Sequence, residues 1–185
     1  MFSNWSYAKT PQEFAAGLAN EVITKVAKSG VSDEHRAQEF RSLFVKNFDI
    51  PAISRFVTGR FWKPATPEQQ KEFLKLFEDT NVITWSRRFK EYSSQKVEIV
   101  GASKPDEGGV ITIESKILQP NNAAPVVLLW RVMKHADDFK VVDLVIEGLS
   151  MAMTHQSDYR SILQKDGMDG LLKALQQKLT QLQKK

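Results

Sequence analysis

The chain has no cysteine among its 185 residues and no long apolar run. The missing cysteine excludes disulfide bonds, thiolate catalysis and zinc or iron–sulfur sites with Cys ligands. No apolar stretch approaches the ~20 residues that a helix needs to cross a bilayer, so we expect no transmembrane span. Residues 1–9 lack a positive region followed by an apolar stretch, and we expect no signal peptide in the chain as given.

The chain also lacks a large excess of charge of one sign, because it has 26 basic and 22 acidic residues and a net charge of only +4. The charges are scattered, whereas binding to nucleic acid needs a basic cluster, so we expect no nucleic-acid partner. With 42% hydrophobic and 26% charged residues, the composition is that of an ordinary globular chain. At this length it is most simply one domain over residues 1–185.

Recognisable catalytic motifs are missing as well. The chain has no Gly-rich phosphate loop, no Gly-x-Ser-x-Gly elbow and no nucleotide-binding fingerprint. Its three histidines, His35, His135 and His155, do not show the His-x-x-x-His spacing of metal ligands. Asp143 interrupts an apolar strand and is either a buried acid or, more simply, an Asp on the polar face of the strand that pairs with a nearby Arg or Lys. We expect no catalytic residue, no metal and no cofactor.

What the sequence does contain is a helical first half. Thr10-Pro-Gln-Glu13 and Thr66-Pro-Glu-Gln69 both show the capping-box pattern with Pro at the first helical position. Apolar residues follow at helical spacing and predict helices over residues 10–93. Ser150 is a good N-cap for C-terminal helices over residues 150–183, which we expect to break at Asp166-Gly167.

Between the helices, over residues 95–147, the apolar pattern changes to period two. Four such segments, joined by short loops rich in turn residues, predict an antiparallel meander. The segment from Val126 to Lys134 is apolar on both faces. It is therefore either packed between two core layers or lines a cavity with one face.

This order of elements predicts an α+β fold, with one curved, mostly antiparallel four-stranded sheet packed by N-terminal and C-terminal helices around an apolar cavity. The chain has eleven Phe but only three Tyr, and Phe suits a dry interior because it has no hydroxyl to satisfy. At ~0.8 kcal/mol per methylene, burying two long acyl tails contributes more than ~20 kcal/mol of gross transfer free energy. Only an enclosed apolar cavity, and not a surface contact, can bury that many methylenes. An ordinary filled core is the alternative explanation of the aromatic stripes.

Five segments carry a resemblance to known proteins. They are Phe56-Val-Thr-Gly-Arg-Phe-Trp62, Thr66-Pro-Glu-Gln69, Trp130-Arg-Val-Met133, Phe139-Lys-Val-Val-Asp-Leu-Val-Ile-Glu-Gly-Leu-Ser150 and Gly167-Met-Asp-Gly-Leu-Leu172. In this order and spacing, from about Val31 to Leu182, the chain resembles the MlaC / toluene-tolerance family of periplasmic lipid-binding proteins. Two further segments, Trp85-Ser-Arg-Arg-Phe89 and Ser150-Met-Ala-Met-Thr154, resemble its hopanoid-associated HpnM branch. Phe139 and Trp130 depart from the commoner pattern, which has Trp and Tyr there.

The resemblance implies a non-enzymatic lipid carrier in the periplasm, and its export segment is then expected to have been removed. It implies that phospholipid, or hopanoid in the HpnM branch, moves between an outer-membrane lipoprotein complex and an inner-membrane ABC transporter with an MCE-domain protein. Such transport serves outer-membrane lipid asymmetry. The residues themselves leave two alternatives open. One is a small α+β enzyme for an apolar substrate with Asp143 or a His as base, and the other is a structural interaction module whose apolar faces are all core.

For a carrier, we predict which side chains surround the lipid tails, taking the strand faces from alternation. The predicted lipid-binding residues are Phe40, Phe44, Phe73, Phe77, Trp85, Phe89, Ile99, Ile111, Ile113, Leu128, Trp130, Val142, Leu144, Ile146 and Met153. For head-group or docking contacts we predict Arg87, Arg88 and Arg131, for which a solvated surface position is the simpler alternative.

Overall fold

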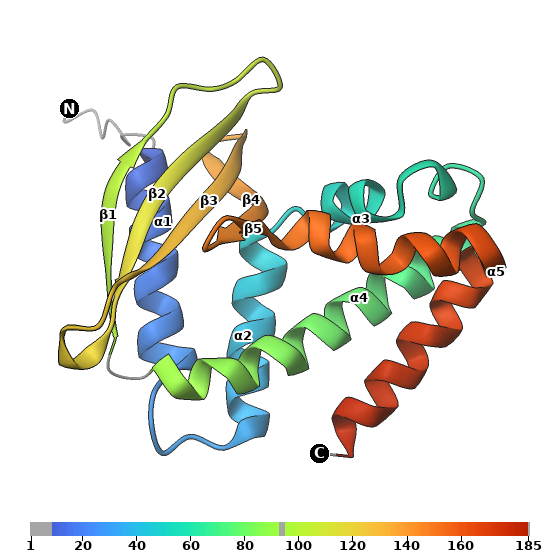
Figure 1. Cartoon of the computed structure of the whole chain (residues 1–185), viewed down its shortest axis with the longest axis horizontal. Coiled ribbons are helices and arrows are strands. Elements are labelled where there is room, and N and C mark those ends of the chain that lie inside the picture. Colours follow the sequence, from blue (N-terminus) through green and yellow to red (C-terminus); the bar gives the residue numbers. More distant parts are fainter. Residues whose placement is uncertain (1–8, 93–94, 185) are drawn as a thin grey trace, which may run out of the picture.

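The computed structural model describes residues 9–92 and 95–184, which form helices and one antiparallel sheet (Figure 1). The long helices are α1 (Pro11–Glu21), α2 (Asp33–Asn47), α3 (Ile50–Thr58), α4 (Pro67–Arg88) and α5 (Met151–Gln183). The strands are β1 (Lys96–Ala102), β2 (Val110–Leu118), β3 (Val126–His135), β4 (Asp138–Ile146) and β5 (Leu149–Ser150). Short helical segments are η1 (Val22–Val26), η2 (Gly59–Phe61), η3 (Phe89–Tyr92) and η4 (Pro120–Asn122). The α+β prediction is confirmed.

Side-chain caps explain where the helices begin. The Thr10 hydroxyl accepts from the backbone N–H of Glu13 at 3.2 Å, and the Glu13 carboxylate accepts from the N–H of Thr10 at 2.8 Å. Thr66 and Gln69 repeat this capping box at 3.2 and 2.9 Å. Ser150 caps α5 with its hydroxyl alone, which accepts from the N–H of Met153. Each cap satisfies amides that the first turn leaves unpaired, and the sequence predicts all three correctly.

The sheet has five strands rather than the predicted four, in the order β1-β2-β3-β4-β5 with every neighbouring pair antiparallel. The additional strand, β5, consists only of Leu149 and Ser150, which pair with Ile146 and Val145 of β4. Gly148, with φ +80°, makes the turn between the two strands. Two residues cannot show a period-two pattern, so the sequence gives no signal for β5.

A bulge in β4 changes which residues face the helices. Arg131 of β3 lies opposite Asp143, but the next residue, Val132, lies opposite Val141, so Val142 is an additional residue in β4. Val141 is fully buried, while Leu144 on the other side of the bulge also faces the interior. Strict alternation along β4 therefore fails at this point.

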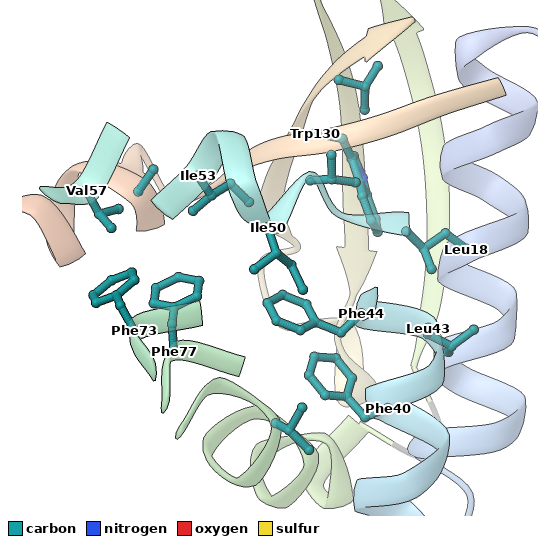
Figure 2. Close-up of a cluster of buried hydrophobic side chains, with 14 of the residues drawn as sticks. Leu18, Phe40, Leu43, Phe44, Ile50, Ile53, Val57, Phe73, Phe77 and Trp130 are labelled. Atoms are coloured by element: carbon teal, nitrogen blue, oxygen red, sulfur yellow. The ribbon is translucent and has the colours of Figure 1, made fainter. Parts of the chain in front are cut away.

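Helix α1 lies along one face of the sheet and contacts β1, β2 and β4 (Figure 1). Helices α3 and α5 pack together beyond the β5 edge of the sheet, and α4 contacts both before it runs back past α2 towards the lower end of α1 in Figure 1. Figure 2 shows that one buried cluster connects the two regions, running from Leu18 and Trp130 at the sheet, past Phe44, to Phe73 and Phe77. The core is thus continuous from the sheet to the helical end of the molecule.

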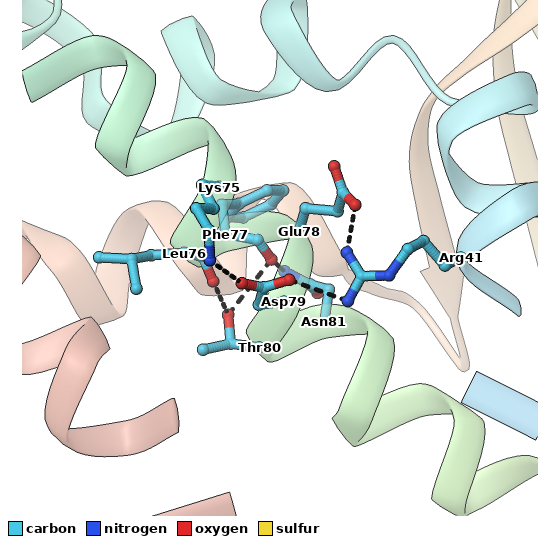
Figure 3. A network of polar contacts seen from close by, with 8 residues as sticks. All are labelled: Arg41, Lys75, Leu76, Phe77, Glu78, Asp79, Thr80 and Asn81. Atoms are coloured by element: carbon cyan, nitrogen blue, oxygen red, sulfur yellow. Dashed lines mark hydrogen bonds and ion pairs between the residues drawn. The ribbon is translucent and has the colours of Figure 1, made fainter. Parts of the chain in front are cut away.

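A network of ion pairs links α2 to α4. Arg41 of α2 forms ion pairs with Glu78 and, at 2.8 Å, with Asp79 of α4, and Lys75 also contacts Asp79 at 2.8 Å (Figure 3). Burial disfavours the charge on Asp79, but hydrogen bonds from Lys75 and Arg41 outweigh it and lower the pKa of the carboxyl.

Gly167, with φ +65°, kinks α5 where the sequence predicts a break.

Candidate functional site

An apolar pocket of about 170 Å³ lies between the sheet and the helices. Its wall combines residues from α1, η1, α2, α3, α4, η3, four strands and the start of α5. Nearly all the side chains that line it are aliphatic or aromatic. The arrangement provides a water-poor space with a few polar groups, which is what binding of an apolar molecule requires.

The sheet contributes one wall through residues that share a face. On β3 this face carries Leu128 and Trp130, which are buried, and on β4 it carries Leu144 and Ile146, which are half-buried. Trp130 lies opposite Leu144 in the β3–β4 pair. Its indole N–H donates to the Ser115 hydroxyl at 2.9 Å, so the one polar atom of the ring is satisfied within the sheet.

The opposite wall is aromatic and comes from α2, α4 and η3. Phe40 and Phe44 stack with ring centroids 5.7 Å apart, and Phe40 also contacts Phe89 at 5.5 Å. Phe89 is in turn 6.2 Å from Trp85. The i, i+4 spacing of the pairs on α2 and α4 places their rings on one face of each helix.

Sequence reasoning missed the part of the wall that comes from the first helix. Leu18 and Ala19 of α1, together with Val22 and Ile23 of η1, line the pocket. The four-residue spacing of Leu18 and Val22 was the available signal, since it marks an inward helix face. The π-helical turn η1 is held by Arg36, whose buried guanidinium donates to the carbonyls of Val26 and Lys28.

Polar groups line the pocket at a few places. Arg88 is exposed yet lines the pocket, so it lies at an opening, and its guanidinium lies 5.1 Å from the Trp85 ring centroid. The Gln95 amide donates to Gln119 at 3.1 Å near the same helix end. Asn81 is buried and donates to the Phe77 carbonyl at 2.7 Å. The opening at Arg88 is therefore the place where a charged group can stay close to water.

Asp143 is a buried carboxylate beside the pocket. Its Oδ2 atom accepts from the Ser150 hydroxyl at 2.6 Å, and its Oδ1 atom accepts from the N–H of Ala152 at 3.0 Å. Arg131 lies 3.8 Å away on the neighbouring strand. Asp143 is thus buried rather than on a polar face, although it does pair with an Arg, as the second alternative predicts. Its oxygen atoms join the sheet to the first turn of α5.

His155 of α5 also lines the pocket. Its ring is 5.3 Å from Phe77 and its Nδ1 atom is 3.4 Å from the Tyr159 hydroxyl. Burial lowers the pKa of His155, with the charge of Lys178 acting in the same direction, so the imidazole is favoured as the neutral form. Burial likewise raises the pKa of Tyr159 above its usual range. Neutral side chains suit an apolar wall.

The structure brings ten of the fifteen predicted wall residues to the pocket. These are Phe40, Phe44, Phe77, Trp85, Phe89, Leu128, Trp130, Val142, Leu144 and Ile146. The other five, which do not line it, are Phe73, Ile99, Ile111, Ile113 and Met153. Phe73, Ile111 and Ile113 are buried elsewhere in the core, Ile99 packs partly against it, and Met153 is 61% exposed. Of the three predicted arginines, Arg88 lines the pocket and Arg87 and Arg131 do not.

Comparison with known proteins gives consistent matches. A family model described as MlaC protein matches residues 16–177. The intermembrane phospholipid transport system binding protein MlaC of Haemophilus influenzae is 31% identical over 127 residues, which cover 68% of this chain and 59% of that protein. The toluene tolerance protein ttg2D of Pseudomonas putida is 20% identical over 167 residues, which cover 88% of this chain and 77% of that protein. The aligned region is therefore less than two thirds of the Haemophilus protein.

Among solved structures, a phospholipid-binding protein from Ralstonia solanacearum, in complex with a phospholipid, has the same fold. The TM-score is 0.82 at 24% identity, and the match covers 94% of this chain and 99% of that one. Within residues 9–92 and 95–184, none of the helices is both long and apolar enough to cross a membrane.

Proposed function

Because this chain belongs to the MlaC protein family, we propose that it is a periplasmic phospholipid carrier whose apolar pocket takes up the acyl tails. The observation that carries the proposal is the pocket wall, in which aromatic rings from α2, α4 and η3 face aliphatic residues of β3 and β4. The Haemophilus relative, a binding protein of phospholipid transport, supports phospholipid as the ligand.

The energetics of the pocket favour a hydrocarbon ligand. Each methylene removed from water contributes about 0.8 kcal/mol, and the wall offers few polar groups that would have to lose water on binding. Release costs little extra if the tails pass directly into another apolar site. A wall of this kind therefore suits a carrier, which must bind its cargo firmly and still exchange it.

The size of the pocket adds a condition. A cavity of about 150 Å³ holds a molecule as small as benzene, and the pocket here measures about 170 Å³. Two acyl tails need several times this space, so the pocket has to widen when lipid enters. Half-buried wall residues on both sides, such as Trp85 and Leu144, are the ones expected to become covered by the ligand.

The head group is expected to remain at the opening beside Arg88. That guanidinium is exposed, lies against the Trp85 ring and is well placed to meet a phosphate while the tails enter the apolar part. The other predicted lipid contacts stay predictions, and so do the head-group or docking contacts predicted for Arg87 and Arg131. Arg131 is already close to Asp143, which favours a structural role for it.

We propose further that the protein acts without catalysis. Asp143, the base in the enzyme alternative, already accepts hydrogen bonds from Ser150 and Ala152 and so has a structural task. The Haemophilus relative is a binding protein of phospholipid transport, and the Ralstonia protein is a phospholipid-binding protein. As a carrier, the protein would work between an outer-membrane lipoprotein complex and an inner-membrane transporter with an MCE-domain protein. Capture of this protein by each purified complex can test that proposal.

Analysis of the co-purified lipid tests the proposal. The protein, purified without detergent from a Gram-negative host, is examined by native mass spectrometry and its organic extract by lipid mass spectrometry. We expect roughly one phospholipid per chain. Recovery of hopanoid from a hopanoid-producing host, in preference to phospholipid, would support the HpnM-type alternative. Protein that repeatedly contains no lipid and takes none up from vesicles would contradict a carrier function.

A further inference from the structure

A second hollow, of about 330 Å³, lies at the surface between α3–η2 and the middle of α5. It shares no lining residue with the apolar pocket, although α3 and α5 contribute to both. Its floor contains Val57 and Leu163, which are almost completely buried, and its rim contains Arg60 and Arg160. The rim is thus basic, and the hollow is closed below by side chains that expose almost no surface.

Among the residues that the structure describes, no acidic side chain in this hollow balances its positive charge. The lining residues include two Arg and no acidic residue. On α5 the positions four residues before and after Arg160 are Gln156 and Gln164, where a Glu would give an ion pair along the helix. Within the part of the chain that the structure describes, neither Arg60 nor Arg160 takes part in an ion pair. Both guanidinium groups are therefore available to an external anion.

Two contacts hold the polar rim in position. The guanidinium of Arg60 lies 5.1 Å from the centroid of the Phe61 ring, which orders a side chain that would otherwise be mobile. The Gln156 amide donates to the Phe56 carbonyl at 2.8 Å, which leaves its oxygen as an acceptor at the rim. Gly59, with φ +55°, makes the turn that brings Arg60 next to α5. The rim therefore offers the Arg60 guanidinium, held against Phe61, and the Gln156 oxygen as an acceptor.

From this arrangement we infer that the hollow is a docking site for a carboxylate of a partner protein, together with a backbone N–H of the same segment. Planar guanidinium groups match a carboxylate in charge and geometry. The Gln156 oxygen would accept a backbone N–H of the same partner segment. A free inorganic anion satisfies only the two arginines and brings no backbone N–H to the Gln156 oxygen. The chemistry thus favours an acidic peptide segment over a simple anion.

Titration of the full-length ¹⁵N-labelled protein with small probes tests this inference. The probes are acetyl-Leu-Glu-amide, its neutral analogue acetyl-Leu-Gln-amide, and inorganic phosphate. We expect the Glu peptide to shift the backbone amides of residues 59–61 and 156–164, and to bind at least about three-fold more tightly than the Gln peptide, which is the gain of a partly exposed ion pair. Equal affinity for the two peptides would overturn the inference. So would phosphate binding as tightly as the Glu peptide, because the Gln156 acceptor would then contribute nothing.

Matched variants show whether the two arginines are responsible. Arg60→Gln and Arg160→Gln are each expected to weaken the Glu peptide at least about three-fold. Arg55→Gln serves as the control, because Arg55 is exposed on α3 but does not line the hollow. Equal affinities for all three variants would contradict the assignment. Lipid content is measured on the same samples and should not change, so failure of the docking site and failure of the carrier function can be distinguished.

Discussion

Asp143 and Ser150 join the last long strand of the sheet to the longest helix, with the Asp143 Oδ2 atom accepting from the Ser150 hydroxyl at 2.6 Å. The same hydroxyl accepts from the backbone N–H of Met153 at 3.1 Å and so caps α5. Asp143 Oδ1 adds a contact to the N–H of Ala152 at 3.0 Å. A negative charge at a helix N-terminus is favourable, and here it also fixes where α5 leaves the pocket wall.

Replacing Asp143 by Asn removes this charge and exchanges one acceptor for a donor. Because Asp143 is buried, we expect Asp143→Asn to lower the free energy of unfolding by about 1–3 kcal/mol. Urea denaturation measures the change, with Asp138→Asn as a control at an exposed ion pair, where we expect less than about 1 kcal/mol. Unchanged stability of Asp143→Asn, together with loss of an enzymatic turnover, would instead favour the enzyme alternative.

The indole of Trp130 gives a second test of the sheet wall. Ser115→Ala leaves the buried indole N–H without its acceptor, so we expect a loss of about 1–3 kcal/mol in unfolding free energy. In Trp130→Phe the Ser115 hydroxyl still donates to the Leu128 carbonyl, at 3.0 Å. The double variant Ser115→Ala/Trp130→Phe should therefore lose less than the sum of the two single losses. Strict additivity in urea denaturation would show that the two side chains are not coupled.

Stability is expected to depend on pH through His155. Burial lowers the pKa of His155 in the folded protein, whereas the unfolded chain titrates near ~6.5. The unfolded state therefore binds the proton first, and the contribution of neutral His155 is fully present above about pH 6.5 and is lost as the pH falls towards the folded pKa. The loss is at most about 1.4 kcal/mol per pH unit for one group.

The measurement compares unfolding free energies of the wild type and His155→Gln between pH 7.5 and 5.5. Asp143, Asp158, Tyr159 and Lys178 surround this position in both proteins, so their own titration largely cancels in the difference. The wild type should lose more stability on acidification than His155→Gln. The exposed His35→Gln variant should follow the wild type, and parallel curves for wild type and His155→Gln would contradict the prediction.

The sequence predicts helix starts well because a cap is a local arrangement. Thr10 and Glu13, or Thr66 and Gln69, lie within one turn, and their contacts depend on nothing distant. The kink at Gly167 is predicted for the same reason. By contrast, β5 is too short for any periodic signal.

The pocket wall is predicted less completely because periodicity gives the direction of a side chain but not its position along the element. Phe73 and Phe77 share one face of α4, yet only Phe77 reaches the pocket, since Phe73 packs against Tyr159 and Trp62 instead. Met153 is predicted to line the pocket, but its side chain is exposed on the solvent side of the first turn of α5. Which part of a helix faces the sheet is decided by tertiary packing.

Filling the pocket tests its role in lipid binding. Leu144 and its neighbour Val145 are both half-buried, but only Leu144 lines the pocket. Leu144→Trp places a larger side chain in the pocket, whereas Val145→Trp places the same large side chain on the other face of β4. We expect Leu144→Trp to reduce co-purified phospholipid several-fold, and Val145→Trp to leave it within about two-fold of the wild type, because overpacking away from the pocket affects stability rather than the binding space.

Lipid is quantified by extraction and mass spectrometry, relative to protein, and the unfolding free energy of each variant is measured in parallel. A similar loss of stability in the two variants makes the comparison fair, because the difference in lipid then reflects the space that Leu144 borders. If both variants retained wild-type amounts of lipid, the tails would have to lie somewhere other than between the aromatic wall and β4. If both lost it equally, general destabilisation would explain the result, and the pocket would have no special part in binding.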